Sequence, residues 1–303
     1  MSFLIGEKPV VALYSGDLVI GRLMAGDGYV WPAEPPSARR TTYLYLTLPD
    51  SARSKTLYYY QSAANAVEID WGDGSAVETK ASSGAVNLSH TYAAAGSYIV
   101  QLTVAENALW SPSPGYESIF GIWSGKSDTS PELTAVRLSD EGITFDDGYG
   151  AVAFQNCVSL EAIRLPACVD RVPDYFANGC TGITTIRLPN SIDLIEYYAF
   201  QNCTSFGPNY ELRAGEIQYG AFGGCTALRK IWLRDTVETM TVTTTSSSGT
   251  VTARKGPFAG CSDQLVIYCE AASKPAGWDE YWDVRTGTDT RHTVVWGQTT
   301  RPW

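Results

Sequence analysis

AFQNC at residues 153–157 is the first copy of a short motif, ending in cysteine, that recurs with variations along the second half of this 303-residue chain. The steps between successive cysteines of this kind are 23, 23, 22 and 36 residues. A fixed period with apolar residues at fixed places is typical of a solenoid, whose coils bury their apolar faces only by stacking on one another. The five copies are AFQNC (153–157), YFANGC (175–180), AFQNC (199–203), AFGGC (221–225) and PFAGC (257–261).

Each repeat also carries a short segment of alternating apolar residues, which predicts one strand per coil. SFGPNYELR (205–213) departs from the others because it contains Pro208, and it predicts an irregular coil. The long last step holds a Thr/Ser-rich insertion at 241–256, which predicts a projecting hairpin around residues 246–249. The regular strand segments are ELTAVRLS (132–139, with no cysteine before it), SLEAIRLP (159–166), GITTIRLP (182–189) and ALRKIWLR (227–234).

Residues 132–303 as a whole resemble the BspA-like class of leucine-rich repeats, which occurs on surface and phage proteins of gut and oral bacteria. The resemblance rests on the pattern C-x-S/T-L-x-x-I-x-L-P followed by AF-x-x-C. The segments IYCEAASKPAGWDEYWD (267–283) and HTVVWG (292–297) are similar to the closing coil of such arrays. This implies that Trp278, Trp282 and Trp296 cap the open end of the core.

Residues 38–106 predict a β-sandwich, because TTYLYLTL (41–48) and SYIVQLTV (97–104) alternate apolar and polar residues. WGDGS (71–75), HTY (90–92) and GSY (96–98) resemble the PKD family of immunoglobulin-like domains. That family implies a spacer, or in some members a sugar-binding module. Asp70 and Asp73 suit a tight turn better than a calcium site, so no metal is expected.

The remaining segments divide the chain into four parts. Residues 1–37 predict a small hairpin unit that ends in a proline-rich linker, and 107–131 a second linker before the repeat domain at 132–303. LYSGDLV (13–19) and the closing VWP (30–32) resemble N-terminal segments of bacteriophage and prophage virion proteins. This implies that residues 1–37 dock onto other virion proteins. The fold class expected is therefore mainly β: a hairpin unit, a PKD-like sandwich and a BspA-like solenoid.

Composition excludes several classes of function. The 22 Lys and Arg against 32 Asp and Glu give a net charge of −10, which disfavours nucleic acid as a partner. No run of apolar residues is long enough for a membrane helix, and Glu7, Lys8 and Asp17 stand where a signal peptide would be apolar. We therefore expect a soluble protein without membrane insertion.

Catalytic signatures are few. The two histidines, His90 and His292, are far apart in sequence, and no nucleophile elbow, P-loop or zinc motif is present. Carboxylate pairs such as Asp146 and Asp147 keep an acid/base mechanism open as the lesser alternative. The sequence predicts a protein that is not an enzyme and needs no cofactor.

The seven cysteines predict a buried ladder of free thiols, since one cysteine per coil at constant register marks a core position. A bridge made by Cys168 or Cys269 is the alternative.

Two columns are candidates for ligand binding. The residue before the last core position of each strand gives Arg137, Arg164, Arg187, Glu211 and Trp232, and three stacked arginines favour an anionic ligand unless acids such as Glu161 neutralise them. Counting five and six residues back from the cysteines gives the second column, whose rings could stack on sugars: Tyr175, Tyr197, Tyr198 and Tyr219. Ordinary β-surface packing is the alternative for these tyrosines.

Three functions fit these features. The hypothesis that we prefer is a phage virion protein, on the tail or capsid, which displays its repeat domain in multiple copies, including as a homo-oligomer, to a host-surface glycan or protein. The second is a bacterial cell-surface adhesin with the same modules. The third is a polysaccharide-degrading enzyme, which would need paired acids on one face of the solenoid.

Overall fold

The computed structural model describes residues 38–50, 53–113, 119–120, 130–145, 151–248 and 250–303, and six short strands between residues 3 and 30. The predicted mainly β class is confirmed: the helical structure in these residues is the single 3-10 turn η1 (Ala38–Arg40). None of the described helical structure has the length and apolar character needed to span a bilayer. The chain divides into two compact units, Met1–Arg39 and Arg40–Trp303, which are described separately.

The described residues of the first unit form antiparallel pairs of strands, and each strand is three residues long. They are β1 (Phe3–Ile5) with β2 (Lys8–Val10), β3 (Leu13–Ser15) with β4 (Leu18–Ile20), and β5 (Leu23–Ala25) with β6 (Gly28–Val30). The sequence predicts a single small hairpin unit here, and the structure has three strand pairs. The turn residues 16–17 and 26–27 and the linker residues 31–37 lie outside the described residues.

The second unit begins with a two-sheet sandwich. One sheet has the order β10-β8-β12, and the other places β11 between β7 and β9. Strand β7 alternates buried and partly exposed residues, so its apolar face points into the core around the fully buried Trp71 and Tyr59. The strands are β7 (Thr41–Leu48), β8 (Ser54–Gln61), β9 (Val67–Asp70), β10 (Gly84–Thr91), β11 (Gly96–Val104) and β12 (Trp110–Ser111).

The predicted linker 107–131 contributes to this sandwich, because β12 pairs with β8. Trp110 is completely buried, and its indole Nε1 donates to Ser139 Oγ at 3.1 Å. The sandwich therefore extends past residue 106. Residues 114–118 and 121–129 of the predicted linker lie outside the described residues.

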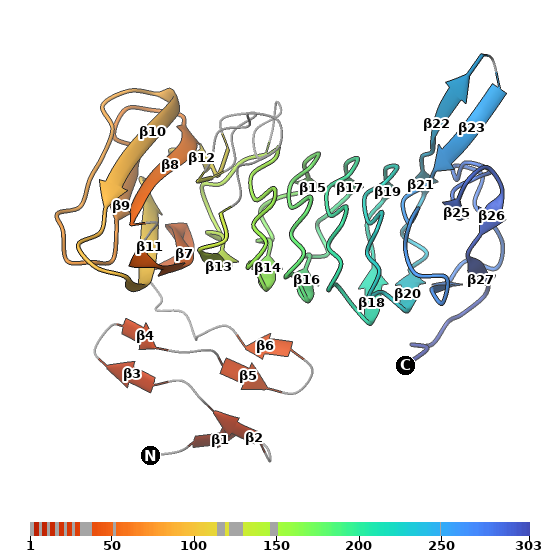
Figure 1. The fold of residues 1–303 in the computed structure, drawn as a ribbon, viewed down its shortest axis with the longest axis horizontal. Helices are drawn as coiled ribbons and strands as arrows, with labels where there is room; N and C mark the ends of the chain where they lie inside the picture. Colours follow the sequence, from red (N-terminus) through yellow and green to blue (C-terminus); the bar gives the residue numbers. More distant parts are fainter. Residues whose placement is uncertain are drawn as a thin grey trace. The chain divides into compact units, whose positions relative to one another are not determined.

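The solenoid stacks its coils side by side (Figure 1). Its first face has parallel ladders through β13 (Leu133–Arg137), β14 (Ala162–Arg164) and β16 (Thr185–Arg187), and then through β18 (Asn209–Leu212), β20 (Lys230–Leu233), β24 (Val266–Cys269) and β27 (Thr293–Val295). The opposite face has one parallel ladder through β15 (Arg171–Val172), β17 (Leu194–Ile195), β19 (Glu216–Ile217) and β21 (Thr239–Met240).

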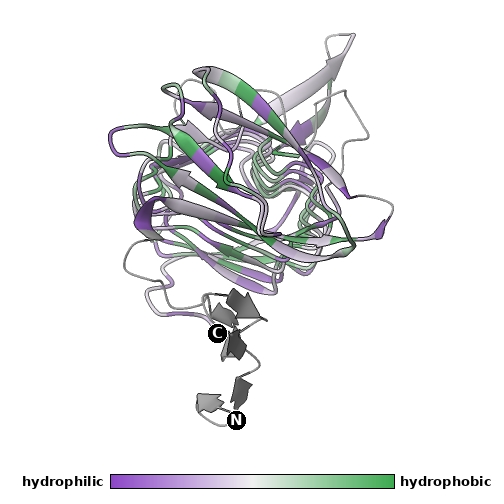
Figure 2. Cartoon of the chain, turned by 90° about the vertical axis from the view of Figure 1, so that its left-hand side faces the viewer, coloured by the Kyte–Doolittle hydropathy of each residue, from purple (hydrophilic) through white to green (hydrophobic). Residues whose placement is uncertain are grey.

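The sandwich and the solenoid share a sheet. Strand β13 pairs in parallel with β14 on one side and antiparallel with β7 on the other, in the order β16-β14-β13-β7-β11-β9. The sandwich thereby covers the edge that the first coil would otherwise expose to solvent. The end-on view in Figure 2 shows hydrophobic and hydrophilic residues alternating along the sandwich strands. The division at residues 106 and 132 stays a prediction about sequence modules.

The first face is interrupted at the irregular coil. The described residues contain no ladder between β16 and β18, although β17 and β19 remain paired on the opposite face. Pro208 has no N–H to donate, and its carbonyl accepts from the backbone N–H groups of Arg229 and Lys230 in the next coil. The predicted irregularity of this coil is therefore confirmed.

Columns of phenylalanine and cysteine fill the solenoid. Phe154, Phe176, Phe200, Phe222 and Phe258 are all completely buried, and neighbouring rings lie 5.2 to 6.4 Å apart. In the cysteine column, each thiol after Cys157 donates to a carbonyl of the preceding coil, as Cys203 Sγ does to Ala177 O at 3.3 Å; the donors are Cys180, Cys203, Cys225 and Cys261. All seven cysteines are free and all but Cys168 are buried, which confirms the predicted ladder over a bridge. Burial raises the pKa of the Cys203 thiol, so it stays protonated.

The far end of the array is closed by aromatic packing. The rings of Trp278, Trp282 and Trp296 lie within 4.7 to 6.1 Å of one another, as the resemblance to a closing coil implies. The inserted segment forms the predicted hairpin, from β22 (Thr243–Ser247) and β23 (Thr250–Lys255), which projects from the solenoid in Figure 1. Strands β25 (Val284–Thr286) and β26 (Thr290–Arg291) form a further short pair beside it.

Candidate functional site

The four predicted tyrosines meet in one cluster on the solenoid, which we call the tyrosine cluster. Tyr197 and Tyr219 stack with ring planes 9° apart and centroids at 5.5 Å. Tyr198 contacts both Tyr175 and Tyr219, at 5.2 and 5.3 Å. All four side chains are partly exposed to solvent.

The turn before each cysteine holds these rings in place. Tyr175 and Tyr198 have φ values of 53° and 59°, and Gly220 occupies the same turn position one coil later with φ 69°. A Cβ on Gly220 would lie 2.4 Å from Cδ1 of Tyr198. The missing side chain at Gly220 therefore provides the room in which the Tyr198 ring packs.

Side chains from each following coil secure the backbone of the cluster. The backbone N–H of Asp174 donates to Glu196 Oε2 at 3.0 Å, that of Tyr197 to Gln218 Oε1 at 3.1 Å, and that of Tyr219 to Thr241 Oγ1 at 3.0 Å. Sequence reasoning missed Glu196, Gln218 and Thr241. Glu196 and Gln218 stand seven residues before their cysteines, and that spacing was the signal that could have found them.

The hydroxyls of Tyr175, Tyr197 and Tyr198 have raised pKa values. Burial raises the pKa values of Tyr175 and Tyr198. Burial, and then a hydrogen bond from the Tyr197 hydroxyl to the Asp174 side chain, raise the pKa of Tyr197. Lys255, where the inserted hairpin rejoins the coil, places its Nζ 5.9 Å from the centroid of the Tyr198 ring. The cluster thus combines flat apolar faces with hydroxyl donors, a carboxylate and an ammonium group.

The arginine column has the predicted register, since Arg137 pairs with Arg164 and Arg164 with Arg187. The prediction that Arg137 lies on the surface is wrong. Its side chain is buried, with the guanidinium 5.6 Å from the centroid of the Tyr43 ring, because β7 covers that edge of the array. Asp140 lies 3.8 Å from the Arg137 guanidinium and 3.6 Å from that of Arg164, so an acid intervenes between these two arginines. Arg187 is exposed.

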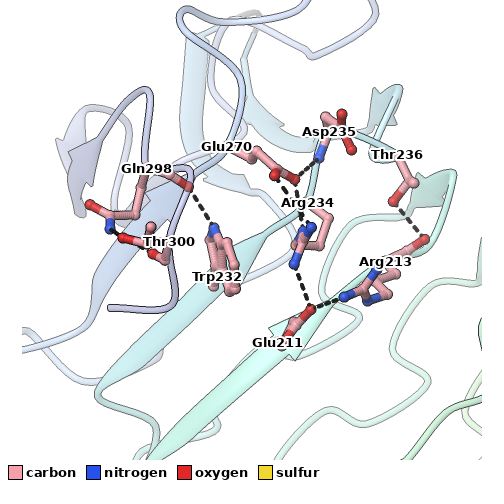
Figure 3. A network of polar contacts seen from close by, with 9 residues as sticks. All are labelled: Glu211, Arg213, Trp232, Arg234, Asp235, Thr236, Glu270, Gln298 and Thr300. Atoms are coloured by element: carbon pink, nitrogen blue, oxygen red, sulfur yellow. Dashed lines mark hydrogen bonds and ion pairs between the residues drawn. The ribbon is translucent and has the colours of Figure 1, made fainter. Parts of the chain in front are cut away.

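Trp232 is also buried, so its predicted surface position is wrong. Only 4% of the residue is exposed, because the C-terminal segment covers it and its indole Nε1 donates to Gln298 O at 2.9 Å. The Arg234 guanidinium lies 4.2 Å from the centroid of the indole ring. Figure 3 shows this arrangement beside Glu211. Glu211 pairs with Trp232, as predicted. The missing ladder between β16 and β18 separates this pair from the column of Arg137, Arg164 and Arg187.

The acidic turn of the sandwich has a structural role. Asp70 Oδ1 accepts from Gly72 N at 2.8 Å, and Asp73 Oδ1 accepts from Ser75 N at 3.0 Å. His90 Nε2 lies 2.8 Å from Asp73 Oδ2 and its ring stacks on Trp71 at 4.7 Å. Hydrogen bonding to Ser75, followed by the contact with His90, lowers the pKa of Asp73 to about 2.

The described part of the chain contains no candidate metal centre. Within it, no three His, Cys, Asp or Glu residues lie close enough together to hold a metal ion. His292 is buried with Nε2 3.1 Å from Phe258 O, and burial lowers its pKa. Asp146 and Asp147 lie outside the described residues. That the protein is not an enzyme stays a prediction.

Comparison with known families decides the nature of the coils. Residues 149–254 match the model of the BspA type leucine-rich repeat region in six copies. These coils are BspA-type leucine-rich repeats. The BspA-type region holds the whole tyrosine cluster and most of the inserted hairpin.

No curated protein matches the chain. A crystal structure of a leucine rich cell surface protein from Faecalibacterium prausnitzii is 16% identical, with a TM-score of 0.20, over 42% of this chain and 45% of that one. The chain thus spans less than half the length of that protein.

Proposed function

We propose that this chain is a recognition protein of a bacterial surface, which binds a glycan through the tyrosine cluster of its BspA-type repeats. The observation that carries the proposal is the assembly of four partly exposed tyrosines from three successive coils into one continuous aromatic surface. Aromatic faces bind the C–H faces of sugar rings, while hydroxyls and charged groups beside them bind the sugar hydroxyls. Asp174 and Lys255 supply such groups at the edge of the cluster.

The arrangement suits binding better than catalysis. Hydroxyls with raised pKa values are poor proton donors to a leaving group at neutral pH, yet they donate and accept hydrogen bonds well. The backbone contacts of Gln218 and Thr241 fix the turns that carry the rings before any ligand arrives. Fixed rings lose little conformational entropy on binding, which favours affinity.

The test uses an array of immobilised neutral oligosaccharides probed with the whole chain. We expect Tyr197→Ala combined with Tyr219→Ala to weaken binding about tenfold or more, because it removes the stacked pair. Tyr197→Phe with Tyr219→Phe keeps the rings and should retain most of the binding. Tyr58→Ala, at a partly exposed tyrosine of the sandwich, is the matched control.

Two results would contradict the proposal. One is the absence of binding to every oligosaccharide by the wild-type chain. The other is equal binding by the alanine double variant and the wild type, with circular dichroism showing both to be folded. Binding to a surface protein alone is a case of the first result, in which a protein ligand replaces the glycan.

The location at the bacterial surface rests on the BspA-type repeats. A location on a virion, with residues 1–37 docked on other virion proteins and the PKD-like sandwich as a spacer, is the second candidate. The observation that favours docking is the separate compact unit formed by Met1–Arg39. Both candidates display the repeats in multiple copies, so that weak contacts add through effective concentration.

Fractionation separates the two locations. Quantitative mass spectrometry of washed envelopes and of purified phage particles from the same culture should find the protein in the envelope. Its enrichment in particles, at a fixed ratio to their structural proteins, would instead select the virion. Cytoplasmic recovery alone would contradict both.

A further inference from the structure

A pocket lies away from the tyrosine cluster, at the place where the first face of the solenoid is interrupted. We call it the notch; its volume is about 190 Å³. The coil of β16 provides one wall and the coil of β18 the other, so the notch lies between two consecutive coils. Its lining residues are Leu188, Pro189, Asn190, Ile192, Tyr210, Glu211, Leu212, Arg213 and Ala214.

A shortened corner in the β18 coil creates the notch. From the strand of the first face to the strand of the opposite face, the chain advances by seven positions from Arg187 to Leu194, but by only five from the equivalent Glu211 to Glu216. The next coil returns to seven, from Trp232 to Thr239. The β18 coil therefore cannot fill the corner that its neighbours occupy.

The side chain at that corner is also smaller. Two residues before the opposite strand, neighbouring coils bury Val169, Ile192 and Val237, whereas the β18 coil has Ala214. Protein interiors are close-packed, and a missing branched side chain at a stacked position leaves a space. Ile192 and Ala214 face this space from opposite sides.

Polar groups at the notch are held in a charge-balanced network (Figure 3). Glu211 Oε1 accepts from Arg213, and from Arg234 Nη1 at 3.0 Å. Arg234 Nε also donates to Glu270 Oε2 at 2.7 Å. Partial burial opposes ionisation of Glu270, but the backbone N–H of Asp235 and the Arg234 guanidinium outweigh it and lower the pKa. Two acids and two arginines therefore cancel at neutral pH.

We propose that the notch binds one neutral sugar residue, at a site separate from the tyrosine cluster. Its apolar wall of Leu188, Pro189 and Ile192 suits the C–H face of a pyranose ring. Asn190, Glu211 and Arg213 supply both acceptors and donors for hydroxyls. The balanced charge disfavours an anionic or cationic ligand. The volume is below the roughly 300 Å³ at which pockets for larger ligands begin, which limits the occupant to one ring.

The test is saturation-transfer NMR on the whole chain with methyl glycosides of glucose, galactose, mannose, N-acetylglucosamine and N-acetylgalactosamine. At millimolar concentration we expect at least one of them to receive saturation. Ala214→Val restores the residue type of the neighbouring coils, fills the notch and should remove the part of that transfer that the notch provides. Asn190→Ala, at an exposed position, should weaken it several-fold without affecting folding. Ala76→Val, at an exposed position of the sandwich, is the matched control.

The outcomes separate this proposal from the function of the tyrosine cluster. The Tyr197→Ala and Tyr219→Ala double variant should keep saturation transfer to the notch ligand, and Ala214→Val should keep binding to the oligosaccharide array. No transfer to any glycoside, or unchanged transfer in Ala214→Val, overturns the notch proposal alone. Stronger transfer to N-acetylneuraminic acid than to every neutral glycoside overturns its charge argument and hence the proposal.

Discussion

Replacing Phe200 by alanine is expected to lower the free energy of unfolding by about 3 to 5 kcal/mol, the range typical of a buried phenylalanine. Phe200 is completely buried in the middle of the phenylalanine column. Its ring lies 6.4 Å from that of Phe176 and 5.4 Å from that of Phe222. The truncation leaves a cavity between coils that the β15-β17-β19 ladder holds together on the opposite face, so they cannot collapse to fill it.

Chemical denaturation followed by circular dichroism measures this change. Phe200→Leu retains most of the volume and should cost about 1.5 kcal/mol or less. Val158→Ala, at an exposed position of the same array, should change stability by no more than about 0.5 kcal/mol. A loss in Phe200→Ala no larger than that in Val158→Ala would contradict the packing of the column.

Replacing Gly72 by alanine is expected to destabilise the protein by more than about 2 kcal/mol. Gly72 has φ +76°, in the left-handed region, and a Cβ there would lie 2.4 Å from the backbone oxygen of Ile99. A backbone oxygen inside a sheet cannot move aside as a flexible side chain can. The turn would have to open, which would break the hydrogen bond between Gly72 N and Asp70 Oδ1.

Gly74 provides the matched control two residues later. Its φ is +82°, but a Cβ there meets nothing within 4 Å. Gly74→Ala should therefore cost only the left-handed conformation, about 1 kcal/mol. Thermal unfolding of both variants side by side measures the difference, and equal melting temperatures would show that the close approach to Ile99 is absent.

The periodic part of the fold could be predicted because parallel coils in register bring the same repeat position together. Aligning the strand segments of successive coils was enough to place Arg137 beside Arg164 and Arg164 beside Arg187. The sheet shared by the sandwich and the solenoid could not be predicted in this way. Strands β7 and β13 are about ninety residues apart, and pairing at that distance leaves no local pattern in either strand.

The candidate site residues also fall into two groups: those at repeated positions could be predicted, and those whose burial depends on a distant segment could not. The four tyrosines were found because their spacing from the cysteines repeats, and neighbouring coils bring repeated positions into contact. The surface positions of Arg137 and Trp232 were wrong because burial depends on what covers a strand, here β7 and the segment around Gln298. The notch escaped prediction because it arises from two missing residues, and a shorter corner carries no motif of its own.

The closure of the array at both ends has a consequence for its evolution. Each coil pairs only with its immediate neighbours, strand β7 covers the first coil, and the three tryptophans close the last. Duplication or loss of a 23-residue segment in the gene would insert or remove one coil while leaving both closures intact. Such duplications and deletions would lengthen or shorten the array in steps of about 4.8 Å, the spacing of adjacent strands, without exposing an unpaired strand at either end.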